Sequence, residues 1–423
     1  MASKSKENAA EELKPTEEKG CGQRFMSIFG ECELSKNLIR RNKNSIYWIP
    51  FRFVDAILRG ISQVVFVSNP ISGALILSGI YLGGIVIGHG TLACTVGALL
   101  SALYFKQPSD AIQDGLTQFN GVLVGSVTFS LYPAIFGGVL DLRSWSITVL
   151  GSVISVPIQV ALVGLLQGVK ASFKNLLEKE ERKEYGVPGF TLPFNLTACM
   201  VMSLLLATHQ DSLDTSSQNP NKNSTAEIVP SSEDSLLASD VIVGVVKSMG
   251  QVYAVNTLPG SLLMLLGVFI YSPLLAFIEL SGACLGTLLG LYLNPGYPGD
   301  VYAGIWGYCA LLTAGATGGF FAILTPRAVP LVILAISTTA ALQKTIQPFL
   351  QIGGLPVFTF PFVLTSWVFL LVTTDNGVLY RTDNPTVPER NIKIWMDTVT
   401  ESRKLKIPDF IQKIRSNKIE DAA

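Results

Sequence analysis

The feature that most constrains the fold is the length of the apolar blocks in the sequence. A helix needs about 20 residues to cross roughly 30 Å of hydrocarbon, and most blocks are close to that length. Six lie in the first half of the chain, at residues 48–67, 71–88, 91–105, 116–131, 147–166 and 190–206. Six follow, at residues 241–255, 261–280, 282–293, 304–318, 320–342 and 355–372. Only 15% of residues are charged, against about 25% in a soluble domain, so the sequence predicts an all-α polytopic membrane protein.

The distribution of charge predicts how the chain is oriented in the membrane. Lysine and arginine are concentrated near the N-terminus, in residues 170–186 and after Thr374, and the positive-inside rule places these segments in the cytoplasm. The loop between the two sets of blocks is acidic and carries the acceptor sequence Asn223-Ser224-Thr225, which indicates an extracellular loop with a candidate glycosylation site at Asn223. A second such sequence, at Asn195, lies within an apolar block and is expected to be fortuitous.

The expected organisation follows from these boundaries. It comprises a cytoplasmic tail at 1–47, a first membrane half at 48–207 with a cytoplasmic insertion at 170–186, an extracellular loop at 208–240, a second membrane half at 241–374 and a cytoplasmic tail at 375–423, in the plasma membrane. With both termini inside and the loop outside, each half must cross an odd number of times. Six blocks per half satisfy this if one block enters and returns, which leaves about five spanning helices and one re-entrant half-helix. Halves with odd span numbers would be inverted relative to each other.

An internal repeat supports the two-half organisation. Three elements recur in the same order, namely Gln63-Val64 with Gln251-Val252, residues 115–120 with 304–309, and residues 187–194 with 355–362. The offsets are 188, 189 and 168 residues, and the basic insertion at 170–186 in the first half explains the drop.

Each copy of the third element places a threonine, Thr191 or Thr359, between two prolines. Prolines remove backbone donors and disfavour a continuous helix. A broken helix is tolerated at membrane depth where it packs inside the protein or lines a wet cavity. The alternative is a kinked packing helix whose threonine bonds back to its own backbone.

The other repeated side chains are amides and bulky apolar groups. Gln63 and Gln251 could face a pathway or could bridge helices, since an unpaired amide in an apolar region costs a few kcal/mol. Bulky groups near the repeats, each of which could equally be core, are Phe66, Phe119, Leu123, Tyr308 and Leu312. The repeated inventory of amide, hydroxyl and aromatic groups without repeated charge suits a flat, neutral solute.

The sequence carries no motif for catalysis, cofactor binding or metal binding. His89 and His209 are the only histidines, and no nucleotide-binding or hydrolase motif is present, so we expect neither an enzyme, a cofactor nor a nucleic-acid partner. An ion-coupled carrier should place ionisable groups at the centre of its pathway. None belongs to a repeated element.

The motifs resemble those of the urea transporter family of animals and bacteria, over roughly residues 51–372. The residues that carry the resemblance are Pro188-x-x-Thr191-x-Pro193-Phe194, Leu355-Pro356-x-x-Thr359-x-Pro361-Phe362, the run from Asp55 to Pro70, and Gln118-Phe119-Asn120-Gly121. The resemblance implies facilitative urea transport by a homotrimer in the lipid bilayer, with a pore in each protomer. It implies a slot formed by Gln63, Phe66, Phe119 and Leu123 with Gln251, Tyr308 and Leu312, and with Thr191 and Thr359 at its midpoint.

The second half departs from the family pattern in two places. Tyr308-Cys309 stands where Phe-Asn is expected, and residues 256–261 differ from the first-half sequence around Asn69. Replacement of the expected asparagine by Cys309 would remove an amide that could support the half-helix, and the selectivity of the pathway could differ. A channel of the same fold for water, ammonia or a small amide is the main alternative, and an ion-coupled transporter is disfavoured by the uncharged repeats.

Overall fold

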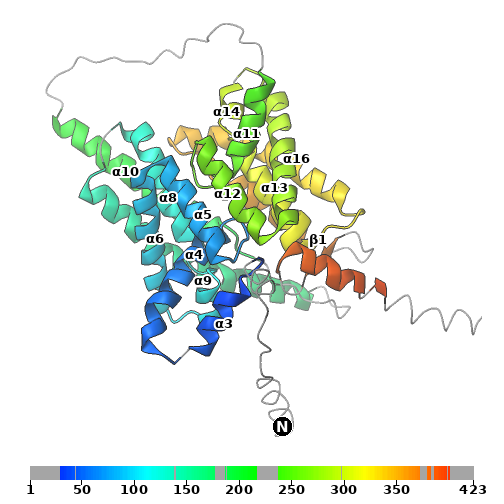
Figure 1. The fold of residues 1–423 in the computed structure, drawn as a ribbon. Coiled ribbons are helices and arrows are strands. Elements are labelled where there is room, and N and C mark those ends of the chain that lie inside the picture. The colour runs from blue at the N-terminus through cyan, green and yellow to red at the C-terminus, as the bar shows by residue number, and fades with distance from the viewer. Residues whose placement is uncertain are drawn as a thin grey trace, which may run out of the picture.

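The computed structural model describes residues 29–42, 44–137, 140–176, 186, 188–216, 237–296, 298–371, 379–382, 385–397 and 399–400. These residues form a bundle of helices with one two-residue strand pair (Figure 1), which confirms the predicted all-α fold. Among the described helices, those long and apolar enough to cross a membrane are Ile85–Tyr104, Phe119–Phe136, Leu142–Gln167, Leu192–His209, Pro273–Leu293 and Val329–Ile352. The glycosylation prediction at Asn223 lies outside the described residues.

The elements follow each other in two matching series. The first is α3 (Glu33–Arg41), η2 (Ile46–Trp48), α4 (Ile49–Gln63), α5 (Pro70–Gly83), α6 (Ile85–Tyr104), α7 (Ser109–Gln113), α8 (Phe119–Phe136), α9 (Leu142–Leu176) and α10 (Leu192–Ser216). The second is α11 (Ala238–Gln251), α12 (Leu258–Tyr271), α13 (Pro273–Leu293), α14 (Pro298–Tyr302), α15 (Tyr308–Gly315), η3 (Ala316–Phe320), β1 (Ala322–Ile323), α16 (Val329–Ile352), α17 (Phe360–Leu371) and β2 (Tyr380–Arg381). The helices α4 to α10 therefore correspond in order to α11 to α17.

Backbone conformation repeats between the halves at the offsets found in the sequence. Positive φ angles, which are uncommon outside glycine, occur in three pairs: Phe66 and Ala254 (61° and 57°), Gly115 and Gly304 (80° and 81°), and Phe190 and Phe358 (47° and 48°). The members of each pair are 188, 189 and 168 residues apart. The breaks between helices are thus part of the repeat, and the predicted duplication is confirmed.

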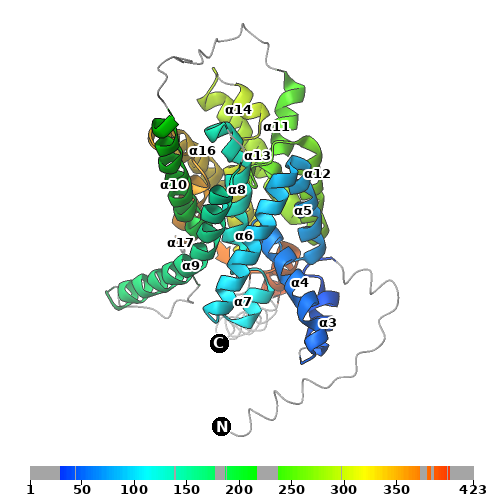
Figure 2. The same cartoon turned by 90° about the vertical axis from the view of Figure 1, so that its left-hand side faces the viewer.

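The two halves are inverted and related by a pseudo-twofold axis. The equivalent short helices α7 and α14 lie at opposite ends of the bundle (Figure 2). Where α5 and α12 pack together, a methyl group on Gly79 would lie 2.6 Å from the Gly260 carbonyl, and one on Gly267 would lie 3.0 Å from the Ser72 carbonyl. Gly79 and Gly267 are equivalent in the repeat, as are Ser72 and Gly260. Such reciprocal contacts are what a twofold relationship produces.

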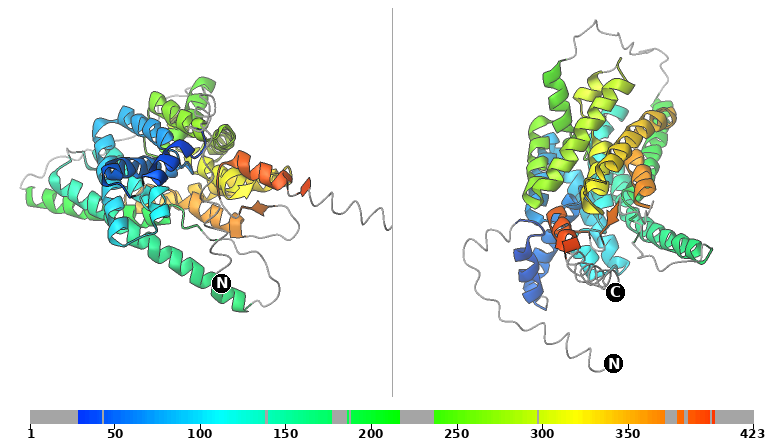
Figure 3. Two further views of the ribbon diagram at one scale, coloured as in Figure 1. Left: turned by 60° about the horizontal axis from the view of Figure 1, so that its bottom comes forward. Right: turned by 90° about the vertical axis from the view of Figure 1, so that its right-hand side faces the viewer.

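Several predicted helical blocks are wrong as continuous helices, because each contains a helix end. The block at 320–342 contains the end of η3 and strand β1, and α16 starts only at Val329. The block at 71–88 is divided at Gly84, and the block at 261–280 is divided at Ser272. The Ser272 hydroxyl caps α13 by accepting from the Leu275 amide at 2.9 Å, and Pro273 starts that helix. The basic insertion begins as a continuation of α9, whose C-terminal part projects away from the bundle (Figures 2 and 3).

Candidate functional site

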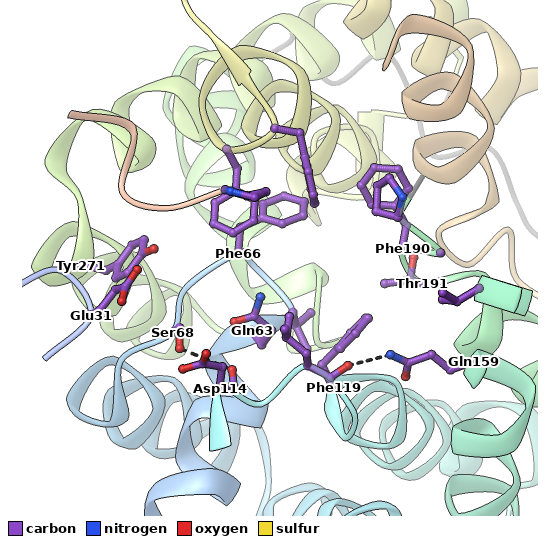
Figure 4. Close-up of a pocket in the computed structure, with 18 of the residues that line it drawn as sticks. Glu31, Gln63, Phe66, Ser68, Asp114, Phe119, Gln159, Phe190, Thr191 and Tyr271 are labelled. Carbon is purple, nitrogen blue, oxygen red and sulfur yellow. Dashed lines mark hydrogen bonds between the residues drawn. The ribbon is translucent and has the colours of Figure 1, made fainter. Parts of the chain in front are cut away.

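A cavity of about 380 Å³ lies between the two halves (Figure 4). Both halves contribute to its wall, the first through α4, α8 and the turn before α10, the second mainly through η3 and α17. One side of the cavity is marked by Glu31, Ser68 and Asp114, and the opposite side by Phe190 and Thr191. Charged groups thus mark one side, which we call the mouth, and an uncharged hydroxyl group lies on the opposite side, which we call the inner end.

Four of the predicted site residues line this cavity: Gln63, Phe66, Phe119 and Thr191. Gln63 is the last residue of α4, and its side-chain oxygen is buried without a hydrogen-bond partner among the described residues. The backbone carbonyl of Gln63 accepts from the Phe66 amide at 3.0 Å, and this hydrogen bond closes the turn that places Phe66 in the left-handed conformation. Gln63 and the Phe66 ring therefore lie side by side in the cavity wall, and the Gln63 amide oxygen is buried behind the surface without a partner among the described residues.

Phe66 is held by aromatic side chains of the second half. Its ring stacks on Phe320 with centroids 5.4 Å apart, and it makes edge contacts with Phe321 and Phe362 at 5.9 and 6.1 Å. Phe320 and Phe321 lie where α15 gives way to the π-helical turn η3 and strand β1. Thr382, in the segment that follows strand β2, donates its amide to the Phe321 carbonyl at 3.1 Å and so supports this wall.

The inner end of the cavity is closed by a pair of threonines. The hydroxyl oxygens of Thr191 and Thr359 are 2.6 Å apart. Thr359 also donates its hydroxyl and its amide to the side-chain oxygen of Asn195, at 2.7 and 3.1 Å. Because the Thr359 proton is used on Asn195, Thr191 is the donor to Thr359, and the lone pairs of Thr191 remain available as acceptors. The alternative in which each threonine bonds back to its own backbone is wrong.

A glutamine supports the helix break before α8 in the first half and before α15 in the second, and the comparison of the two half-sequences missed this pair. Gln159 donates to the Leu116 carbonyl at 2.7 Å, and Gln343 donates to the Ile305 carbonyl at 2.8 Å. Leu116 and Ile305 are equivalent in the repeat. The glutamines are 184 residues apart, an offset that differs from those of the other elements.

The predicted asparagine support is present in the first half only. Asn120 accepts from the Phe194 amide at 3.1 Å and donates to the Gln159 side-chain oxygen at 3.1 Å. Cys309 stands at the equivalent position of the second half, and the side-chain oxygen of Gln343 is buried without a partner among the described residues. The cysteine that stands where the family pattern has asparagine therefore leaves the Gln343 oxygen without the partner that its equivalent has in the first half.

The remaining predicted site residues are not among those that line the cavity, although Thr359 contacts the lining residue Thr191. Leu123, Leu312 and Thr359 are buried. Gln251 donates to the Ala303 carbonyl at 2.9 Å, and the Tyr308 hydroxyl donates to the carbonyl of Phe358, a left-handed residue. The structure therefore brings four predicted residues to one cavity, and the slot role of these other five stays a prediction.

The mouth of the cavity is built by the N-terminal segment. Lys36 forms ion pairs with Glu31 at 2.8 Å and with Asp114 at 2.9 Å. Beneath it, the buried Arg59 pairs with Asp55 at 2.8 Å and donates to the Glu31 carbonyl at 3.0 Å. The segment that carries α3 is thereby fixed against the membrane bundle, with charged side chains at the mouth of the cavity.

Two inverted helical halves around a cavity with an uncharged inner end define a channel-type transporter for a small neutral solute. The family model described as urea transporter matches residues 54–374. The chain is 31% identical over 348 residues to urea transporter 1 of Capra hircus, covering 80% of this chain and 83% of that protein. It is 32% identical over 335 residues to urea transporter 1 of Rattus norvegicus, covering 79% and 80%. The chain therefore belongs to the urea transporter family, and it is a transporter, not an enzyme.

Proposed function

We propose that this chain conducts urea down its concentration gradient, without coupling to an ion, through a pathway between its two halves. The observation that carries the proposal is the 2.6 Å hydrogen bond between Thr191 and Thr359. It joins the two broken elements across the pseudo-twofold axis and places a hydroxyl group at the end of the cavity. A repeated, uncharged hydrogen-bonding group at this place suits a neutral solute.

The cavity offers the groups that a desolvated urea molecule needs. Urea is planar and carries four N–H donors and one carbonyl acceptor, so stripping its water is costly unless partners in its plane replace it. The lone pairs of Thr191 can accept N–H groups, and the Gln63 oxygen, which has no partner among the described residues, can do so once its side chain turns towards the solute. The rings of Phe66 and Phe119 can pack on the faces of the solute. This combination favours a flat polar molecule over an ion, which would find no charge compensation at the inner end.

The second half completes the pathway in this proposal. Gln251, Leu312 and Thr359 are the repeat equivalents of Gln63, Leu123 and Thr191, and Tyr308 is the equivalent of Phe119. We infer that they line the part of the pathway beyond the threonine pair. Of the residues lining the cavity, the charged ones, Glu31, Lys36 and Asp114, lie at the mouth, which is why an uncoupled pathway is favoured over an ion-coupled one.

We further infer how the protein is placed and assembled. The positive-inside rule assigns the end that carries α3 to the cytoplasm, so the cavity is a cytoplasmic vestibule and both termini are cytoplasmic. Membership of the family favours a homotrimer in the plasma membrane with a pathway in each protomer.

Stopped-flow light scattering of proteoliposomes tests the proposal. Vesicles that contain the purified protein should shrink and recover rapidly under a urea gradient, and collapsing the proton and sodium gradients should not change the rate. Thiourea, acetamide, glycerol and water serve as comparison solutes. Rapid water or ammonia flux without urea flux would replace the proposed solute, and loss of urea flux with the ion gradients would replace the mechanism.

A further inference from the structure

Helix α13 carries a glutamate in the interior of the protein that the proposed pathway does not use. Glu279 is fully buried, and neither oxygen of its carboxyl group has a hydrogen-bond partner among the described residues. An ionisable side chain within a membrane span is costly and commonly marks a functional position.

The inverted repeat shows what accompanies this glutamate. The first-half equivalent of Glu279 is Thr91, and the first-half equivalent of Gly315 is Ser126. The Thr91 hydroxyl donates within its own helix, to the Ile87 carbonyl at 2.7 Å. In the second half, the longer side chain of Glu279 replaces that of Thr91, and Gly315, which has no side chain, replaces Ser126.

The same exchange occurs elsewhere along this helix pair, which supports the alignment. In the first half a methyl group on Gly125 would lie 2.8 Å from Cys94 Cβ, and in the second half one on Gly282 would lie 2.4 Å from Ala314 Cβ. Gly282 is the equivalent of Cys94, and Ala314 is the equivalent of Gly125. The glycine of this contact lies on α8 in the first half and on α13 in the second, and the close contact is the same. Helix α13 therefore packs on α15 as α6 packs on α8.

Gly315 brings Glu279 up to the wall of the cavity. A methyl group on Gly315 would lie 2.9 Å from the Glu279 Oε1 atom, 3.1 Å from its Cγ atom and 3.3 Å from Cδ2 of Phe66. Glu279 and Phe66 thus both approach the position of a Cβ atom on Gly315, too closely to leave room for a methyl group there. Phe66 in turn lines the cavity.

We propose that Glu279, admitted by Gly315, is a positioning residue that backs the Phe66 ring and so sets the width of the slot and its selectivity against larger ureas. The inference rests on the proposed function, because it treats Phe66 as a wall of the urea pathway. It adds a determinant from the second half that lies behind the wall. The ring is stacked on Phe320 on one face. Because Glu279 and Cδ2 of Phe66 approach the same position beside Gly315, the glutamate occupies space towards which the ring edge would otherwise move.

The experiment measures the ratio of N-methylurea flux to urea flux in proteoliposomes. This ratio does not depend on the amount of folded protein, so a loss of yield does not mimic the effect. Glu279→Ala should raise the ratio about tenfold, since one methyl group in a fitted apolar site is commonly worth that much discrimination. Glu279→Gln, which keeps the size of the side chain, should leave the ratio close to the wild-type value. Thr91→Ala is the matched control in the first half and should not change it.

A double variant tests the shared space directly. Gly315→Ala alone should reduce urea flux, because its methyl group displaces either the carboxyl group or the Phe66 ring. The variant that combines Gly315→Ala with Glu279→Ala should recover urea flux relative to Gly315→Ala, because the methyl group then has room. An unchanged ratio in Glu279→Ala, or an equal rise in Thr91→Ala, would overturn the inference while leaving the proposed function intact. Absence of urea flux in the wild-type protein would instead identify failure of the proposed function.

Discussion

The hydroxyl oxygens of Thr191 and Thr359 lie 2.6 Å apart across the pseudo-twofold axis, although 168 residues separate them in the chain. Each follows a left-handed phenylalanine, and each immediately precedes the start of a helix. The pair is nevertheless asymmetric, because Asn195 accepts both protons of Thr359 and leaves Thr191 as the donor between them. The broken elements of the two halves therefore meet at a hydroxyl pair with a fixed direction of hydrogen bonding.

Removing either hydroxyl should reduce urea flux while the fold survives. Valine is similar in shape to threonine, so Thr191→Val mainly removes the acceptor that faces the cavity. We expect a fall of about tenfold or more in stopped-flow urea flux, because an unmet hydrogen bond to a desolvated solute is worth about 1–3 kcal/mol. Thr359→Val should act in the same direction. Thr365→Val, at a buried threonine of α17 whose hydroxyl has no partner among the described residues, is the control. Unchanged flux in both test variants would remove these threonines from the pathway.

Asn195→Ala should weaken the same junction from behind. The Thr359 amide and hydroxyl would lose their common acceptor, which costs about 1–3 kcal/mol for a buried polar group. The freed proton could then turn towards Thr191 and occupy a lone pair that urea would use. We expect a lower thermal unfolding midpoint together with reduced urea flux. Leu196→Ala, at a neighbouring exposed position, should change neither quantity appreciably, and a similar effect in both variants would contradict the role given to the amide.

The threonine pair could be predicted from the sequence because it recurs in both halves, whereas its support could not. Asn195 corresponds to Val363 in the second half, so comparison of the halves gives no sign of it. Glu279 is hidden in the same way, since its equivalent is a threonine. Residues that act once, in only one copy of a duplicated fold, are invisible to a search for repetition.

Two further features, the supporting glutamines and the helix break at Ser272, were not predicted from the sequence, for different reasons. The glutamines Gln159 and Gln343 do repeat, but different connection lengths before α9 and α16 change their offset. The sequence does contain a signal for the break at Ser272, because serine followed by proline is a common helix start. Hydrophobicity alone could not reveal it, since both sides of the break are apolar.

Glu389→Ala should release the helical segment at residues 388–397 from the start of α13. The Glu389 carboxylate accepts from the Ser272 hydroxyl at 2.9 and 2.7 Å and from the Leu274 amide at 3.0 Å, and so caps the start of α13. Loss of such a cap costs about 1 kcal/mol. We expect faster tryptic cleavage after Arg390 and Lys393. Asp397→Ala, at an exposed acidic residue of the same segment, is the control, and equal cleavage rates in the two variants would sink the prediction.

Cys309→Asn should stabilise the second half by restoring the arrangement seen in the first. In the first half the Asn120 amide donates to the Gln159 oxygen at 3.1 Å and accepts from the Phe194 amide at 3.1 Å. The equivalent Gln343 oxygen is buried without a partner among the described residues. Supplying a donor to an unsatisfied buried acceptor is worth about 1–3 kcal/mol, so the thermal unfolding midpoint of the purified protein should rise.

The reverse exchange provides the matched control for this substitution. Asn120→Cys should lower the midpoint, because it leaves both the Gln159 oxygen and the Phe194 amide without their present partner. If the unpaired Gln343 oxygen has no energetic consequence, Cys309→Asn would lower the midpoint as well, because the introduced side chain is larger and the site is fully buried. Opposite signs for the two substitutions would establish that the asparagine is a support that the second half has lost.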